Sequence, residues 1–294
     1  MALPAEGLLR PGTRATDAPG TTPYFFKPPW QRREEERLEP VEDPTKDCPP
    51  ELNKVIEVGL FFEGAHWKGG DSEDLKKRTI NKLSKRYPGP LRYYTTDATP
   101  IAAAQNIADA KEFLSRKLCE TATVGPDGKT ILICGELKID LFGYSQGAIA
   151  ALALADDLQS EGLRCVMKRA DGSEMMLWRQ PMPVRFLGVL DPVATGIWGH
   201  DPGEVPSNVE NFWAAYASDD ESDRLLFGES RQEIANPRRT VDLSPTDGQG
   251  NHKNYVGLDH TKMGWEATVL TDLEIAYAGI RGVTPWNPPP PTRE

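Results

Sequence analysis

Residues 139–148 read Ile-Asp-Leu-Phe-Gly-Tyr-Ser-Gln-Gly-Ala, a strand-like apolar run that passes through Gly-x-Ser-x-Gly into a stretch rich in Ala and Leu. That stretch, residues 148–158, repeats apolar side chains at helical spacing. A serine between such a strand and helix is typical of a nucleophile elbow, in which two glycines let strand and helix approach closely. We therefore predict Ser145 as a nucleophile, with Gly143 and Gly147 as the elbow glycines. The alternative is a serine that only caps the helix.

A serine hydroxyl needs a base, normally an imidazole, to attack at neutral pH. The chain has four histidines, at positions 66, 200, 252 and 260. In proteins with this elbow the order along the chain is nucleophile, acid, histidine, which favours the last two. His260 follows the apolar run 255–258, and the carboxyl end of a strand is where an open α/β sheet carries its chemistry. We predict His260 as the base and keep His252, in a polar run, as the alternative.

Asp191 is the candidate acid that orients the imidazole. It ends the apolar run 184–190, the clearest strand of the second half of the chain. An aspartate at this place can accept a hydrogen bond from the imidazole and stabilise its protonated form. Asp-Pro is also a common way to end a strand, and that is the alternative.

An acyl-transfer reaction also needs donors for an oxyanion. The backbone N–H of Gln146, the residue after the nucleophile, is the first expected donor. The second should follow an earlier strand, and residues 54–62 form such a strand. We predict the N–H of Gly64 or Ala65, with an ordinary loop glycine as the alternative.

Four segments together resemble the catalytic domain of bacterial type VI secretion lipase effectors, in the same order along the chain. They are Phe61-Phe-Glu-Gly64, Gly143-Tyr-Ser-Gln-Gly-Ala148, Phe186-Leu-Gly-Val-Leu-Asp-Pro-Val-Ala194 and the segment 217–227, with Asp220-Glu221 and Arg224-Leu-Leu-Phe227. The resemblance spans residues 54–281. It implies an α/β-hydrolase that cleaves phospholipid acyl esters through Ser145, Asp191 and His260, as an antibacterial secreted effector with a delivery protein and an immunity protein as partners.

The chain departs from this family at several positions. The family usually has Phe-Phe-Asp-Gly-Thr where this chain has Glu63 and Ala65, Arg where it has Gln146, and a Gly-Gly pair directly after the histidine. The spelling Gly-Tyr-Ser-Gln-Gly is shared with cutinase-like esterases. Two alternatives follow: a soluble carboxylesterase of cutinase-like specificity, and a non-catalytic hydrolase-like module that binds a partner.

The pattern along the chain predicts an α/β fold, a mostly parallel sheet with helices on both faces. We expect strands near 54–62, 91–95, 130–134, 139–143, 184–190, 208–217 and 254–258, and helices near 101–118, 146–161 and 264–281. The insert 163–183 reads as a hairpin or the edge of a lid. Trp198, Phe212 and Trp213 follow Asp191 and are candidates for an acyl pocket, with core packing as the alternative.

Three regions are expected. Residues 1–52 are rich in Pro, Gly and charge and read as a partly disordered arm, residues 53–284 as the catalytic domain, and residues 285–294 as a Pro-rich tail. The chain has no apolar run of 18 residues and no signal-peptide pattern. We therefore expect no transmembrane segment, and a protein made in the cytoplasm and secreted, if at all, without a cleavable signal peptide.

The net charge and the cysteines bear on which ligands the protein can bind. The net charge is −10, and residues 201–229 carry eight acids and one arginine. Nucleic-acid binding depends on Lys and Arg, so this balance disfavours it. The four cysteines, at positions 48, 119, 134 and 165, have no metal-ligand spacing, and we expect buried free thiols, no metal and no cofactor.

Overall fold

A computed structural model describes most of the predicted catalytic domain. The described residues are 48, 50, 53–65, 72–96, 100–169, 171–193, 203–217, 234–237, 240–246, 248 and 254–282. The predicted arm, apart from two residues near its end, and the predicted C-terminal tail lie outside them.

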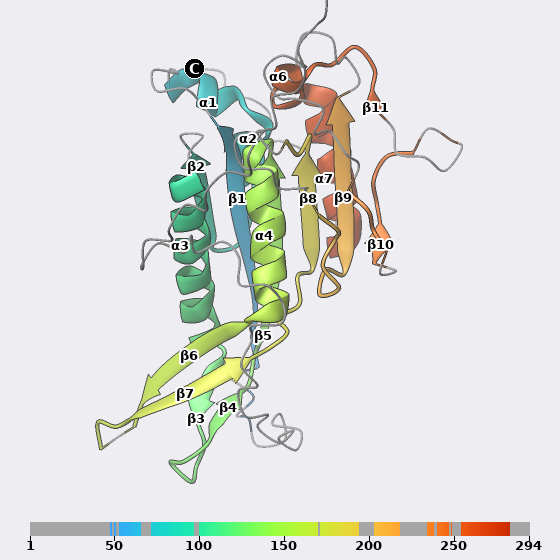
Figure 1. The fold of residues 1–294 in the computed structure, drawn as a ribbon. Helices are drawn as coiled ribbons and strands as arrows, with labels where there is room; N and C mark the ends of the chain where they lie inside the picture. The colour runs from blue at the N-terminus through green and yellow to red at the C-terminus, as the bar shows by residue number, and fades with distance from the viewer. Residues whose placement is uncertain are drawn as a thin grey trace, which may run out of the picture. The chain divides into compact units, whose positions relative to one another are not determined.

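A parallel sheet forms the centre of the fold (Figure 1). Its strands are β1 (Val55–Ala65), β2 (Leu91–Thr96), β5 (Glu136–Tyr144), β8 (Phe186–Leu190), β9 (Asn211–Ala217) and β10 (Val241–Asp242), in the order β10-β9-β8-β5-β1-β2. The short β11 (Asn254–Tyr255) also pairs with β9, and every pairing in this sheet is parallel. All five residues of β8 are buried, as expected for a strand covered on both faces. The predicted fold class is confirmed.

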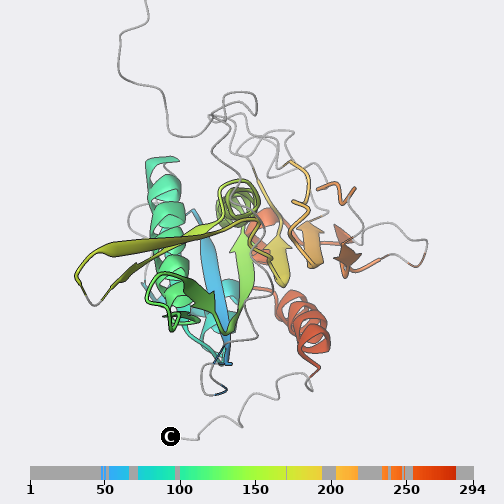
Figure 2. The same ribbon diagram turned by 90° about the horizontal axis from the view of Figure 1, so that it is seen from below.

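Helices cover both faces of the sheet, as the view along the strands shows (Figure 2). On one face, α3 (Pro100–Cys119) and α4 (Gln146–Ser160) pack in one hydrophobic cluster. On the other, α2 (Thr79–Ser84) and α7 (Ala267–Arg281) pack in a second. Successive side chains of a strand point to opposite faces, so Phe61 belongs to the second cluster and Phe62 to the first. Two further helices, α1 (Ser72–Lys77) and α6 (His260–Met263), are short.

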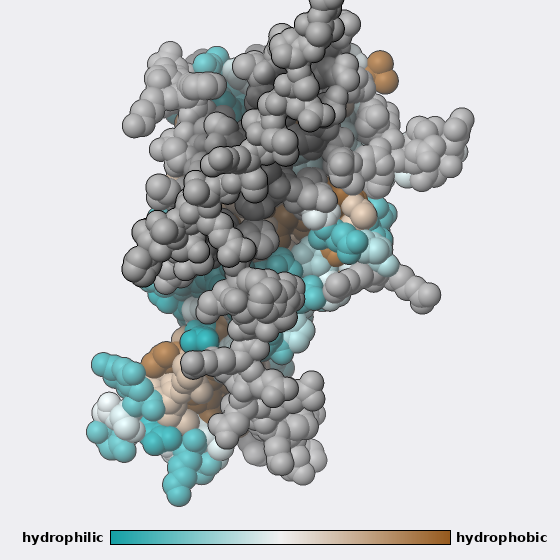
Figure 3. All heavy atoms as spheres, in the orientation of Figure 1, coloured by the Kyte–Doolittle hydropathy of each residue, from teal (hydrophilic) through white to brown (hydrophobic). Residues whose placement is uncertain are grey.

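Two antiparallel hairpins lie outside the sheet. β3 (Ala122–Val124) pairs with β4 (Ile131–Ile133), and β6 (Leu163–Lys168) pairs with β7 (Glu174–Arg179). The strand predicted near 130–134 therefore exists but pairs with β3 and not with the sheet, and the insert 163–183 is a hairpin. Val166 and Met176 face each other across it and are 52% and 64% exposed. Figure 3 shows apolar surface over this hairpin.

The prediction of buried free thiols is wrong. Cys48 is bonded to Cys134 and Cys119 to Cys165, with Cα atoms 5.3 and 5.2 Å apart. The partners are 86 and 46 residues apart in the chain, so spacing in the sequence could not reveal the pairs. Cys134 and Cys165 are buried, as predicted, while Cys48 and Cys119 are partly buried, and the fold brings the four together in two pairs.

Within the described ranges, the helices are too short or too polar to span a membrane.

Candidate active site

Ser145 lies in the sharp turn between β5 and α4. Its backbone has φ 56° and ψ −125°, a conformation that non-glycine residues rarely adopt. A Cβ at position 143 would come within 2.5 Å of the Cα of Ala148, and a Cβ at position 147 would collide with the carbonyl oxygen of Phe62. Only glycine fits at both places, as the elbow prediction required. The Ser145 side chain makes no capping hydrogen bond to α4, so the helix-cap alternative does not describe it.

The hydroxyl of Ser145 meets the imidazole of His260. The distance from Ser145 Oγ to His260 Nε2 is 2.8 Å, across 115 residues of sequence. His260 is the first residue of α6 and is 4% exposed. The one-turn helix is capped by the Asp259 side chain, which accepts from the N–H of Lys262 at 2.7 Å.

The other ring nitrogen of His260 contacts Asp191. The distance from Nδ1 to Asp191 Oδ2 is 2.6 Å, and Asp191 is 1% exposed. A carboxylate facing Nδ1 assigns the ring proton to that nitrogen and leaves Nε2 free to accept from a hydroxyl. Asp191 follows β8 with φ 40°, and its Oδ1 accepts from the N–H of Ala217 at 3.1 Å. The carboxylate is thereby fixed by the neighbouring strand β9 as well as by His260.

These three side chains meet at the carboxyl ends of β5 and β8. Figure 1 shows α6 near this end of the sheet. A neutral imidazole between a carboxylate and a hydroxyl can take the proton of the hydroxyl as its oxygen attacks a carbonyl. The same ring can return the proton to a leaving group. The arrangement therefore has the parts that nucleophilic acyl transfer needs.

The predicted oxyanion donors lie on two sides of Ser145. Gln146 begins α4, and the N–H of a first helical residue has no acceptor within the helix. Gly64 lies against the elbow, since a Cβ there would be 3.0 Å from the Cβ of Ser145. Its N–H, however, donates to Glu63 Oε1 at 3.1 Å. Both candidates lie at the end of β1, which runs to Ala65 and not only to residue 62 as predicted. The N–H of Gly64 is engaged, which favours the N–H of Ala65.

Glu63 is a buried carboxyl of β1 next to Gly64, and the sequence predicted no functional role for it. It is 1% exposed, accepts from the Tyr93 hydroxyl at 3.0 Å and lies 3.5 Å from Arg78 Nη1. Desolvation by burial raises the pKa of Glu63, although Arg78 acts in the opposite direction. The sequence shows a carboxyl at this position, but its contacts come from Arg78, which precedes α2, and from Tyr93 of β2.

The remaining predicted site residues either lie outside the described residues or are buried in the core. His66, His200, His252 and Trp198 lie outside the described residues, so His260 is the one histidine that the described part contains. Phe212 and Trp213 are 0% and 1% exposed and pack in the two hydrophobic clusters on opposite faces of the sheet. Both are core residues in this conformation, and a role in acyl binding stays a prediction.

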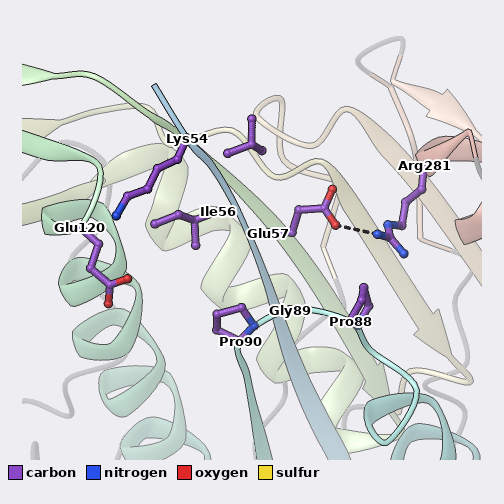
Figure 4. A pocket seen from close by; sticks show the side chains of 9 residues that line it. Lys54, Ile56, Glu57, Pro88, Gly89, Pro90, Glu120 and Arg281 are labelled. Atoms are coloured by element: carbon purple, nitrogen blue, oxygen red, sulfur yellow. Dashed lines mark ion pairs between the residues drawn. The ribbon is translucent and has the colours of Figure 1, made fainter. Parts of the chain in front are cut away.

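A surface hollow of about 430 Å³ lies at the opposite end of the sheet (Figure 4). It is lined by the start of β1 and by Arg281, which forms a 2.9 Å ion pair with Glu57. Glu57 and Gly64 are seven residues apart on one strand, which corresponds to roughly 23 Å. The hollow is therefore separate from the Ser145 site. No cluster of His, Cys, Asp and Glu that could hold a metal ion occurs in the described ranges.

Known proteins resemble this chain only distantly. No protein-family model matches the chain, and no curated protein matches it. Among solved structures, an uncharacterized protein from Pseudomonas aeruginosa is similar with a TM-score of 0.42 and 15% identity, over 73% of this chain and 42% of that one. The Tle1 effector bound to the VgrG spike of the Type 6 secretion system is similar with a TM-score of 0.31 and 15% identity, over 56% of this chain and 45% of that one. This chain thus spans less than half the length of both.

Proposed function

We propose that this protein is a serine-dependent ester hydrolase in which Ser145, His260 and Asp191 act together. The observation that carries the proposal is the continuous hydrogen-bonded chain from Asp191 Oδ2 through the imidazole to Ser145 Oγ, with distances of 2.6 and 2.8 Å. The strained backbone of Ser145, which turns its side chain toward the imidazole, supports it.

The reaction would run in two halves. Ser145 Oγ attacks the ester carbonyl while His260 Nε2 takes the hydroxyl proton, and the resulting oxyanion is bound by the N–H of Gln146 and by that of Ala65 or Gly64. Collapse breaks the bond to the alcohol, which leaves with the proton from His260. Water then attacks the acyl-serine in the same way, with His260 as base, and releases the acid and free Ser145. Asp191 stabilises the imidazolium in both halves.

We further propose a phospholipid or another lipid ester as the substrate, and a role as an antibacterial secreted effector. The support is the resemblance of four sequence segments, which follow one another in the same order along the chain, to type VI secretion lipase effectors. A delivery protein of the secretion apparatus and an immunity protein are the partners that such a role requires. The second candidate, a soluble carboxylesterase, is favoured by the Gly-Tyr-Ser-Gln-Gly spelling at residues 143–147.

A fluorophosphonate probe tests the chemistry. The wild-type protein should form a covalent serine–phosphorus bond with loss of fluoride, and Ser145→Ala should not be labelled. Ser84→Ala is the matched control, since Ser84 and Ser145 are both 5% exposed and Ser84 only donates to the carbonyl of Asn81. Labelling of Ser145→Ala at the wild-type rate, or no labelling of the folded wild-type protein, would reject the proposal.

Incubation with mixed bacterial lipids tests the substrate class. Mass spectrometry should find free fatty acids and lysolipids with the wild-type protein and not with Ser145→Ala. Activity confined to short-chain soluble esters in a chain-length series would instead favour the carboxylesterase.

A further inference from the structure

Tyr144, the residue before Ser145, contacts the segment that carries His260. It ends β5, is 4% exposed and lies 116 residues before His260 in the chain. Its ring stacks on the imidazole, with ring centroids 5.3 Å apart and an angle of 21° between the planes. Its hydroxyl donates to the backbone carbonyl of His260 at 2.7 Å. One side chain thus holds both the ring and the backbone of His260.

The Tyr144 ring is itself enclosed by two glycines. A Cβ at Gly64 or at Gly264 would lie 2.8 Å from the nearest atom of this ring. Gly64 lies at the end of β1, where the second oxyanion donor is predicted, and Gly264 directly follows α6, which His260 begins. The carbonyl of Gly264 in turn accepts from the N–H of Thr79 in α2 at 2.7 Å. The ring therefore lies between the end of β1 and the α6 turn, and a displacement of one of them would displace the other through this ring.

His260 needs such support because its own element is short. α6 has four residues and follows β11, a strand of two. An isolated turn of this length does not hold a side chain in one place by itself. Proton transfer requires a fixed geometry, and a displacement of about 1 Å costs on the order of a hundredfold in rate.

We propose that Tyr144 is the positioning residue of the site, which fixes the imidazole of His260 opposite Ser145 and couples it to the end of β1, where the second oxyanion donor is predicted. The proposal rests on the proposed function for its effect on rate. The position of the imidazole can also be tested without turnover. Tyr144 contacts the ring and the backbone of His260, so it acts through the histidine.

Two substitutions separate the two contacts. Tyr144→Phe keeps the stacked ring and removes the hydroxyl, so the probe-labelling rate and kcat should fall by about fivefold, the value of one neutral hydrogen bond. Tyr144→Leu removes the ring as well, and the fall should be about a hundredfold. KM should change by less than about twofold in both, because Tyr144 holds a catalytic side chain and not the substrate.

Tyr277→Phe is the matched control. Tyr277 is a buried tyrosine, 2% exposed, whose hydroxyl donates to Asp140 at 2.6 Å in a network away from Ser145. Removing this hydroxyl should lower the thermal unfolding temperature without changing kcat per folded molecule. A loss of kcat in Tyr277→Phe equal to that in Tyr144→Phe would mean that general destabilisation explains both, and would overturn the proposal.

A spectroscopic arm is independent of activity. In protein labelled with nitrogen-15 at histidine, the His260 ring signals are identified by their absence in His260→Gln. The wild-type and Tyr277→Phe proteins should show one set of sharp His260 ring signals, with an Nδ1 proton protected from exchange. Tyr144→Leu should show broadened or multiple His260 signals. Identical His260 signals in wild type and Tyr144→Leu would overturn the positioning role. If the wild-type protein is not labelled by the probe, the proposed function fails, and this spectrum still decides whether Tyr144 orders the imidazole.

Discussion

Two residues of the site are held in unusual backbone conformations. Among the described residues, Ser145 and Asp191 are the only non-glycine positions with positive φ, 56° and 40°. Such conformations cost on the order of 1–3 kcal/mol each and persist where the surrounding structure enforces them. The N–H of Ser145 donates to the carbonyl of Leu190 and that of Asp191 to the carbonyl of Ala215, which shows how the neighbouring strands do so. Backbone strain thus concentrates at the two residues proposed as nucleophile and acid.

Asp191→Asn should keep the fold and remove most of the activity. Asn tolerates positive φ well, so the backbone at this position is not disturbed. Its amide cannot stabilise an imidazolium as a carboxylate does, and the rate should fall by about 10⁴-fold. Probe labelling and thermal unfolding, measured together, check both statements. A variant that unfolds like the wild-type protein and labels at the wild-type rate would exclude Asp191 as the acid.

His260→Ala should lower the rate of ester hydrolysis at least about a thousandfold, because a nucleophile, its base and the acid that orients the base depend on one another. His252→Ala, the alternative that the sequence left open, should have little effect. If the two variants behave the other way round in the same ester assay, the base has been assigned to the wrong histidine.

Glu63→Gln should change how stability depends on pH. Burial raises the pKa of Glu63 above its usual 4.5, so the folded protein holds this proton more tightly than the unfolded chain does. The stabilisation is complete below the usual value and is lost as the pH rises through the raised pKa. The amide introduced by Glu63→Gln cannot titrate, so the variant should gain stability relative to the wild-type protein between about pH 4 and about pH 8.

Urea unfolding of both proteins at the two pH values measures this difference. Arg86→Gln, which removes the partner of Glu274 on α7, is a control for the loss of a partly buried ion pair elsewhere. A Glu63→Gln effect that is the same at both pH values would show that the pKa of Glu63 does not differ between the folded and unfolded states.

At the scale of elements, the site depends on short segments that carry little core of their own. β11 and α6 supply His260, while the long elements β5 and α4 supply Ser145. Contacts between elements, such as Thr79 with Gly264, fix the short ones. A substitution in α6 should therefore lower the activity strongly even where it lowers the free energy of unfolding only a little.

Gly264→Ala tests this dependence. A Cβ at this position would lie 2.8 Å from the Tyr144 ring, so the ring or the α6 turn must move. We expect a loss of stability of about 1–3 kcal/mol, typical of overpacking, and a loss of kcat of about tenfold or more. Gly279→Ala in α7 is the matched control, because nothing lies within 4 Å of a Cβ there. It should be neutral or more stable by up to about 1 kcal/mol, with unchanged kcat. Equal behaviour of the two variants would contradict close packing at Gly264.

At the scale of the whole molecule, two disulfides tie parts of the chain that are distant in sequence. Cys119 at the end of α3 is bonded to Cys165 in β6, which attaches the β6–β7 hairpin to the helix. Disulfides are typical of proteins that act in an oxidising compartment, which agrees with the proposed secretion.

Removal of this bond should lower stability and leave the chemistry intact. The Cys119→Ala, Cys165→Ala double variant should lose about 2–5 kcal/mol of unfolding free energy, mainly because the unfolded chain gains freedom. The labelling rate per folded molecule should not change, since the bond lies outside the Ser145 site. Urea unfolding with and without a reducing agent measures the loss, and a double variant as stable as the oxidised wild-type protein would show that the bond is not formed in solution.

The sequence by itself determined the parallel α/β class, the tight turn with two glycines around Ser145, and the choice of three residues whose side chains the fold brings together. Strand and helix periodicity and the two glycines are local signals, and the order of the three residues can be read along the chain, so a single sequence carries them. The tertiary structure decided the rest: the disulfide pairs, the separate β3–β4 hairpin, the engagement of the Gly64 N–H by Glu63, and the contact of Tyr144 with His260. Each depends on residues that only folding brings together, and spacing along the chain does not determine such distances.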